Sequence, residues 1–80
     1  MARYRLRIKK SAIKEIEAIA TKADRLRIIK RIESLADDPR PRGSQKLSGS
    51  EHYRIRQGRY RILYSIKDKE LIIYVIRVAG

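Results

Sequence analysis

The sequence predicts an α+β fold with the element order β-α-α-β-β-β, in which a helical hairpin packs on one face of a small, mainly antiparallel four-stranded sheet. Three patterns predict it: alternation of basic and apolar residues in 3–9, apolar spacings of three and four along 11–36, and renewed alternation from residue 53. Eighty residues correspond to one small domain, so we expect a single domain over 1–80.

The N-terminal half is expected to hold one strand and two helices. The segment "RYRLRIK", 3–9, alternates strictly, which indicates a strand with one buried face. Ser11 is expected to cap an amphipathic helix over 11–21, and Asp24 a second helix that ends at "DDP", 37–39. The expected apolar stripes are Ile13, Ile16, Ile19 and Ala20 in the first helix, and Ile28, Ile29, Ile32, Leu35 and Ala36 in the second.

The C-terminal half is expected to be a loop followed by three strands. Residues 39–52 are rich in Pro, Gly and Ser, which predicts a loop, with Leu47 as its anchor to the core. Alternation on both sides of Gly58-Arg59 predicts a β-hairpin, and the unbroken apolar run "LIIYVI" predicts a last strand buried on both faces. The predicted elements are strands at 53–57 and 60–66, a turn at 67–69 and a strand at 70–78.

The predicted hairpin brings three arginines to one face of the sheet. A two-residue turn at Gly58-Arg59 places Arg56 opposite Arg61, and alternation puts Arg54 on the same side. Like charges opposite one another repel, so this arrangement costs stability unless an anion lies between them. A phosphate or a partner's carboxylates would supply that anion; the alternative is a solvated face whose repulsion is screened by salt. The opposite face, expected to sit on the helices, holds Tyr53, Ile55, Ile62 and Tyr64.

Charge is the strongest signal in the composition. Thirteen arginines and eight lysines make up 21 basic residues against nine acidic ones, a net charge of +12. Such a chain attracts polyanions, above all nucleic acid, and arginine forks onto phosphate. There are two alternatives to nucleic-acid binding: the basic residues form a solvated surface, or they bind an acidic protein partner. Four of the basic residues lie off the apolar stripe of the second helix: Lys22, Arg25, Lys30 and Arg31.

Several classes of function are disfavoured by the residues that are missing or scattered. There is no cysteine, which removes disulfides and thiol chemistry, and neither a signal peptide nor an apolar run of membrane-spanning length is present. We therefore expect a soluble cytoplasmic protein with no membrane contact. The acidic residues are dispersed and no glycine-rich phosphate loop or zinc spacing occurs, so we expect neither a metal nor a cofactor.

RNA cleavage without a metal is the chemistry that the arginines allow. The ribose 2′-hydroxyl attacks the adjacent phosphate, so an enzyme must hold the phosphate, neutralise charge and move two protons. Arg54, Arg56 and Arg61 suit the first two tasks, but arginine scarcely releases a proton. His52 is the only histidine and a further candidate for base or acid. The alternative is that His52 is an exposed loop residue at the start of a strand.

The stretch 46–79 resembles the central and C-terminal sheet of RelE-type toxins of the RelE/ParE superfamily. Its most specific part is "L-x-G-x-x-x-YRIR-x-G-x-YRI-x-Y", and the preceding segment resembles that family's helical hairpin and loop. The resemblance implies a type II toxin that cuts mRNA on the ribosome and inhibits translation. It implies a RelB-type antitoxin as partner, together with ribosome and mRNA, and operator DNA reached indirectly through the antitoxin complex.

Carried over by motif, the family's catalytic basic positions fall on Arg54, Arg56 and Arg61. The RNA-binding set that we expect comprises Arg54, Arg56, Arg59, Arg61 and Arg77. Members of the family usually continue into a short tail with a basic residue and then Tyr or His, whereas "VIRVA" is followed here by Gly80. Three explanations account for the missing tail: the sequence is truncated, the protein is a weakly active or inactive relative, or the chemistry uses other groups such as His52 or Tyr60. Loss of an acid or base costs about 10²–10⁴ in rate, which is compatible with strong binding of ribosome and antitoxin together with weak cleavage.

Two further functions remain open at the level of sequence. One is a catalytically weak or inactive module that binds antitoxin and RNA. The other is a ParE-like toxin directed at a DNA topoisomerase, whose relatives generally lack this set of hairpin arginines.

Overall fold

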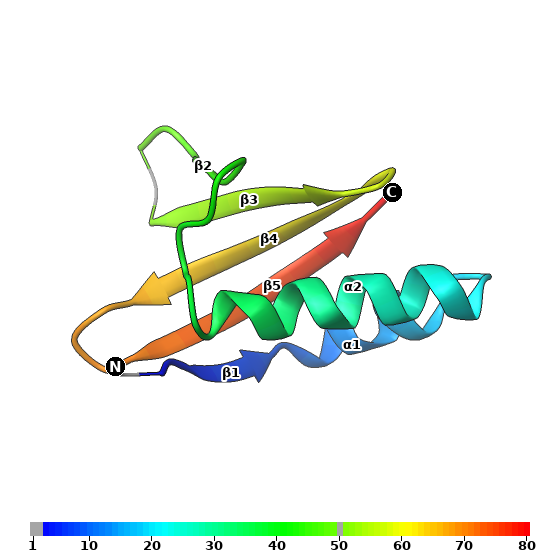
Figure 1. Cartoon of the computed structure of the whole chain (residues 1–80), viewed down its shortest axis with the longest axis horizontal. Helices are drawn as coiled ribbons and strands as arrows, with labels where there is room; N and C mark the ends of the chain where they lie inside the picture. The colour runs from blue at the N-terminus through cyan, green and yellow to red at the C-terminus, as the bar shows by residue number, and fades with distance from the viewer. Residues whose placement is uncertain (1–2, 50) are drawn as a thin grey trace.

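Two helices cover one face of a five-stranded sheet in the computed structural model, which describes residues 3–49 and 51–80 (Figure 1). The elements are β1 (Arg5–Ile8), α1 (Lys10–Glu17), α2 (Lys22–Leu35), β2 (Gln45–Lys46), β3 (His52–Gln57), β4 (Tyr60–Lys67) and β5 (Ile72–Ala79). The strand order is β1-β5-β4-β3-β2, with β1 parallel to β5 and the other neighbours antiparallel. The predicted α+β class and the order of its helices and main strands are therefore confirmed.

The strand count differs from the prediction because the expected loop contains β2. Gln45 pairs with Arg54 and Lys46 with Tyr53, and the backbone N–H of Leu47 donates to the carbonyl of His52 at 2.9 Å. Two residues are too few to show an alternating pattern, so the sequence gives no sign of this strand. Its consequence is that Gln45 lies beside Arg54 at the edge of the sheet.

The core lies between the helices and the inner face of the sheet. Ile13 and Ile29, which the helical spacing places in the apolar stripes, are each 41% exposed, so the stripes are narrower than predicted. Both lie at the margin of a helix that contacts the sheet along one side only. The buried residues of the core are Ala12, Ile16, Ile19, Ile28, Ile32, Leu35, Ile55, Ile62, Tyr64, Ile66, Ile73, Val75 and Val78.

The helix starts differ from the predicted caps. Thr21, not Asp24, caps α2: its side-chain oxygen accepts the backbone N–H of Asp24 at 3.3 Å. The helix α1 begins at Lys10, one residue before Ser11, and has no side-chain cap. The pairing of β1 extends to the N–H of Lys9, which donates to Val75, so the chain enters α1 directly from the strand.

The strand β5 is buried on one face rather than two. Ile73, Val75 and Val78 face the core, while Tyr74 on the other face is 39% exposed. Both helices lie on the same side of the sheet, so the outer side of β5 is not covered by a helix (Figure 1). The preceding turn is also longer than "KDK", because β5 begins at Ile72.

Candidate nucleic-acid interface

The β3–β4 hairpin has the register that the sequence predicts. Arg56 lies opposite Arg61, and Arg54 lies opposite Leu63. Gly58 adopts a φ of 60°, and glycine at the first of two turn residues is typical of a type II′ turn, which matches the twist of the strands. Because a two-residue turn fixes the register, these pairings followed from the sequence and are confirmed.

Three arginines, Arg54, Arg56 and Arg61, lie on the outer side of this hairpin, and we call them the arginine face. Arg56 and Arg61 are exposed and Arg54 is half-buried. Ile55 and Ile62, which alternate with them, are 1% and 0% exposed and belong to the core. The arginine face is therefore the side of the sheet turned away from both helices (Figure 1).

The arginine face holds positive charge without carboxylate partners among the described residues. No Asp or Glu oxygen there lies within 4.0 Å of the three guanidinium groups, and Arg54 donates instead to the neutral Gln45 Oε1 at 2.8 Å. The Cα atoms of a directly opposed pair such as Arg56 and Arg61 are about 4.5–5.5 Å apart, and like charges in this position repel. An anion bound here would relieve that repulsion.

The other two predicted RNA-binding arginines lie elsewhere. Arg59 is exposed in the hairpin turn, where it lines a hollow together with Asp24 and Arg27. Arg77 lies opposite Leu63 on β5, but its Nε is 3.6 Å from a carboxylate oxygen of Glu15. The structure thus brings three of the five predicted arginines together and leaves Arg59 and Arg77 at the margins.

Glu15 is a residue whose role the sequence did not indicate. The strand β1 ends at Ile8, so the edge of β5 beyond it has no neighbouring strand among the described residues, and Glu15 Oε1 accepts the backbone N–H of Val78 there at 2.9 Å. The other carboxylate oxygen contacts Arg77. The only sign of this role is that Glu15 is an acidic residue that lies half-buried on the core-facing side of α1.

The two candidate proton-transfer groups are separated by the sheet. His52 is the first residue of β3 rather than a loop residue; it is half-buried, lies opposite Ser65, and shares the outer side with Arg54. Four residues of strand place its Cα about 13 Å from that of Arg56. Tyr60 lies on the side of Ile62 and packs against the core. Only His52 is therefore on the same side as the arginine face.

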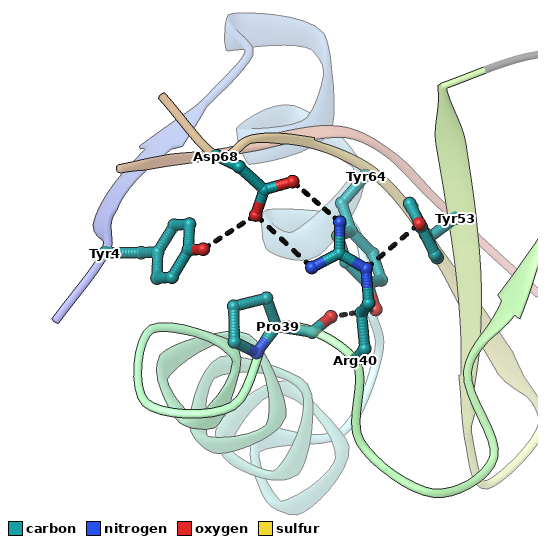
Figure 2. A network of polar contacts seen from close by, with 6 residues as sticks. All are labelled: Tyr4, Pro39, Arg40, Tyr53, Tyr64 and Asp68. Atoms are coloured by element: carbon teal, nitrogen blue, oxygen red, sulfur yellow. Dashed lines mark hydrogen bonds and ion pairs between the residues drawn. The ribbon is translucent and has the colours of Figure 1, made fainter. Parts of the chain in front are cut away.

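A polar network holds the segment before β2 against the rest of the fold (Figure 2). The Asp68 carboxylate accepts from the Tyr4 hydroxyl at 2.7 Å and from both terminal nitrogens of Arg40, at 2.8 and 3.3 Å. Arg40 Nε also donates to the Tyr53 hydroxyl at 3.1 Å. The hydrogen bonds from Arg40 and Tyr4 lower the pKa of Asp68, and the bond to Asp68 raises the pKa of Arg40.

Tyr53 and Tyr64 extend this network into the core. Their rings stack with centroids 5.9 Å apart, and the Tyr64 hydroxyl donates to the Pro39 carbonyl at 2.8 Å (Figure 2). Burial raises the pKa of Tyr64. The segment 39–44 is thus held at its start, at Pro39 and Arg40, a few residues before β2.

Two negative findings concern the described residues. No group of three or more His, Asp or Glu side chains in 3–49 and 51–80 is placed to hold a metal ion. Neither helix in that part of the chain is long and apolar enough to cross a membrane.

Comparison with known proteins decides the family. Residues 6–80 match the family described as the ParE toxin of the type II toxin–antitoxin system parDE. The chain belongs to this toxin family. No curated protein sequence matches the chain significantly.

Solved structures place this ParE-family toxin among RelE-type toxins. A chain of the archaeal RelE–RelB complex from Pyrococcus horikoshii OT3 is 30% identical with a TM-score of 0.87, covering 100% of this chain and 96% of that one. A chain of the intact E. coli RelBE toxin–antitoxin complex is 26% identical with a TM-score of 0.80, covering 96% and 95%. A chain of the RelBE2 complex from Mycobacterium tuberculosis, 20% identical with a TM-score of 0.81, shares the fold over 98% of both chains.

Proposed function

We propose that this toxin is a ribosome-dependent mRNA endoribonuclease that works without a metal ion. The observation that carries the proposal is the arginine face, where Arg56 and Arg61 stand directly opposite one another and no described carboxylate neutralises them. Such a pair does not stabilise the fold. A phosphate bound between the two guanidinium groups would turn their repulsion into two favourable charge-assisted contacts. The fold shared with RelE-type toxins supports the same reading.

The proposed reaction is attack by a ribose 2′-oxygen on the adjacent phosphorus. The 2′-oxygen loses its proton as the new P–O bond forms, and the 5′-oxygen of the next nucleotide leaves and takes up a proton. Arg56 and Arg61 hold the non-bridging oxygens and stabilise the charge that builds on them, with Arg54 beside them. Removing one such donor typically costs about 10²–10³ in rate.

The two proton transfers need other groups. A guanidinium with a pKa above about 12 stays protonated, so the arginine face supplies charge and hydrogen bonds only. His52 is placed to serve a phosphate near Arg54, two residues along β3, rather than one held between Arg56 and Arg61.

Primer extension on translated mRNA, after induced expression, tests the proposal. The expected result is new cleavage sites and growth arrest, both lost in Arg61→Ala. The matched control is Arg5→Ala, which removes an exposed arginine from β1, at the other end of the same sheet, and is expected to remain toxic. Absence of cleavage and of arrest with the wild-type protein present would count against an RNA-cleaving toxin.

An acidic RelB-type antitoxin is the proposed partner. Two observations support it: the relatives from P. horikoshii and E. coli were solved as complexes with RelB, and this chain carries a net charge of +12. Binding would relieve repulsion among the cations, so the complex is expected to melt at a higher temperature than the free toxin. Equal melting temperatures with and without the antitoxin encoded beside it would contradict this.

Action on a DNA topoisomerase is the second candidate. The match of residues 6–80 to the ParE family favours it, while the arginine face favours RNA. A supercoiling assay with purified gyrase separates the two. Inhibition of supercoiling together with intact mRNA would support the topoisomerase, and unaffected supercoiling together with cleaved mRNA would support the nuclease.

A further inference from the structure

A hollow of about 400 Å³ lies at the β3 edge of the sheet, next to the arginine face. The strand β2 pairs with that edge for only two residues, so the rest of β3 has no strand neighbour on this side among the described residues, and Arg31 of α2 lines the space beside it. We call this space the edge hollow. Its lining residues are Arg31, Gly43, Gln45, Arg54, Ile55 and Arg56.

Arg31 lines the edge hollow from α2. The residue is half-buried although helical spacing places it off the apolar stripe, and its Nε is enclosed with no hydrogen-bond partner among the described residues. An enclosed guanidinium N–H without an acceptor is unfavourable, so native proteins rarely retain one.

The edge hollow is also short of negative charge. Arg31, Arg54 and Arg56 contribute three guanidinium groups, and no carboxylate oxygen of the described residues lies within 4.0 Å of any of them. The acceptor that Arg54 uses is the neutral Gln45 amide. A compact anion with several oxygens matches this lining, since guanidinium groups bind phosphate in forked pairs.

We propose that the edge hollow binds a second phosphate of the RNA strand and that Arg31 is a phosphate-binding residue of this toxin. Arg54 and Arg56 line both the hollow and the arginine face, so a strand leaving the reacting phosphate reaches the hollow next. This inference rests on the proposed RNA-directed function. A carboxylate from an acidic protein partner is the competing occupant, and the experiment distinguishes it.

The test measures how the affinity for a short single-stranded RNA changes with salt, by fluorescence anisotropy with the full chain. Each phosphate contact contributes about 0.7 to the slope of log K against log salt for a single strand. Arg31→Gln is expected to lower the slope by about 0.7, a loss of about fivefold in affinity at 0.1 M salt. The control Lys30→Gln removes the same charge from an exposed neighbour on α2 and is expected to change the slope less.

A second variant tests the hollow without touching the half-buried Arg31. Gln45→Glu places a carboxylate at an exposed position of the hollow, where it competes with phosphate. It is expected to weaken RNA binding more than Ser11→Glu, which makes the same change of charge on α1. Equal effects of the two Glu variants, or of Arg31→Gln and Lys30→Gln, would overturn the second phosphate site.

The outcomes separate this inference from the proposed function. If the wild-type chain neither binds RNA with a salt-dependent slope nor cuts mRNA, the proposed function fails and the edge hollow fails with it. If the wild-type chain cuts mRNA but Arg31→Gln leaves the slope unchanged, only the inference about Arg31 fails. If Arg31→Gln weakens binding of the antitoxin and not of RNA, the occupant is a carboxylate and the inference is wrong.

Discussion

Repulsion between Arg56 and Arg61 should be measurable as a stability cost of the free toxin. The two residues are directly opposite in the hairpin and exposed, so their guanidinium groups interact through water. Coulomb's law gives about 0.7 kcal/mol for two unit charges ~6 Å apart in water, and measured cross-strand pairs fall at about 0.2–1 kcal/mol. Screening leaves roughly 0.5 kcal/mol at 0.01 M salt and about 0.1 kcal/mol at 1 M.

A double-mutant cycle in urea isolates this term. Arg56→Gln and Arg61→Gln are each expected to raise the free energy of unfolding by about 0.5 kcal/mol at low salt, equivalent to ~2–4 °C in melting temperature. The double variant should gain no more than either single variant from this pair, because the first change already removes the repulsion. The coupling should nearly vanish in 1 M salt.

The matched control is a second double-mutant cycle, in which Arg56 is paired with Arg5 instead of Arg61. Arg5 lies opposite the apolar Ile72, so Arg5→Gln and Arg56→Gln should be additive. A coupling of zero between Arg56 and Arg61 at low salt, or an attractive one, would refute the argument that this face is poised for an anion.

The remaining predictions concern the fold that carries the arginine face. Thr21→Ala should lower stability by about 0.5–2 kcal/mol through loss of the α2 cap, while Ser11→Ala should not, as thermal melts by circular dichroism would show. Tyr64→Phe removes the hydrogen bond to Pro39 and should cost about 0.5–1.5 kcal/mol in urea unfolding with an unchanged m-value. Asp68→Asn should be less stable than wild type at neutral pH, since the folded-state pKa of Asp68 is depressed. That difference should be full above the unfolded-state pKa of about 3.9 and disappear as pH falls through the lower folded value; a difference independent of pH would contradict it.

The sequence predicted those features that local patterns determine. Alternation and a two-residue turn were enough to place Arg54, Arg56 and Arg61 on one side of the hairpin, because register and side follow from strand geometry alone. The buried run of β5 was also recognised, but the number of covered faces depends on where the helices pack, which the run of apolar residues cannot show.

Other features depend on contacts between segments distant in the chain. The strand β2 forms because Gln45 and Lys46 pair with β3. Glu15 accepts the backbone N–H of Val78 because β1 ends before β5 does. Arg31 was predicted to lie off the apolar stripe, and it lines the edge hollow because α2 packs against β3. Such residues carry no periodic signal, so tertiary structure was needed to find them.

The salt dependence of RNA binding tests most directly whether the arginine face is a phosphate-binding surface. The decisive comparison is between a triple variant with Gln at Arg54, Arg56 and Arg61 and a triple variant with Gln at Arg3, Arg5 and Arg7, which has the same net charge. The hairpin variant is expected to lose about 0.7–1.4 from the slope of log K against log salt, corresponding to the reacting phosphate alone or together with the phosphate in the edge hollow, and the other variant much less. Equal losses of slope in the two variants would show that only net charge matters and would contradict the proposed role of the arginine face.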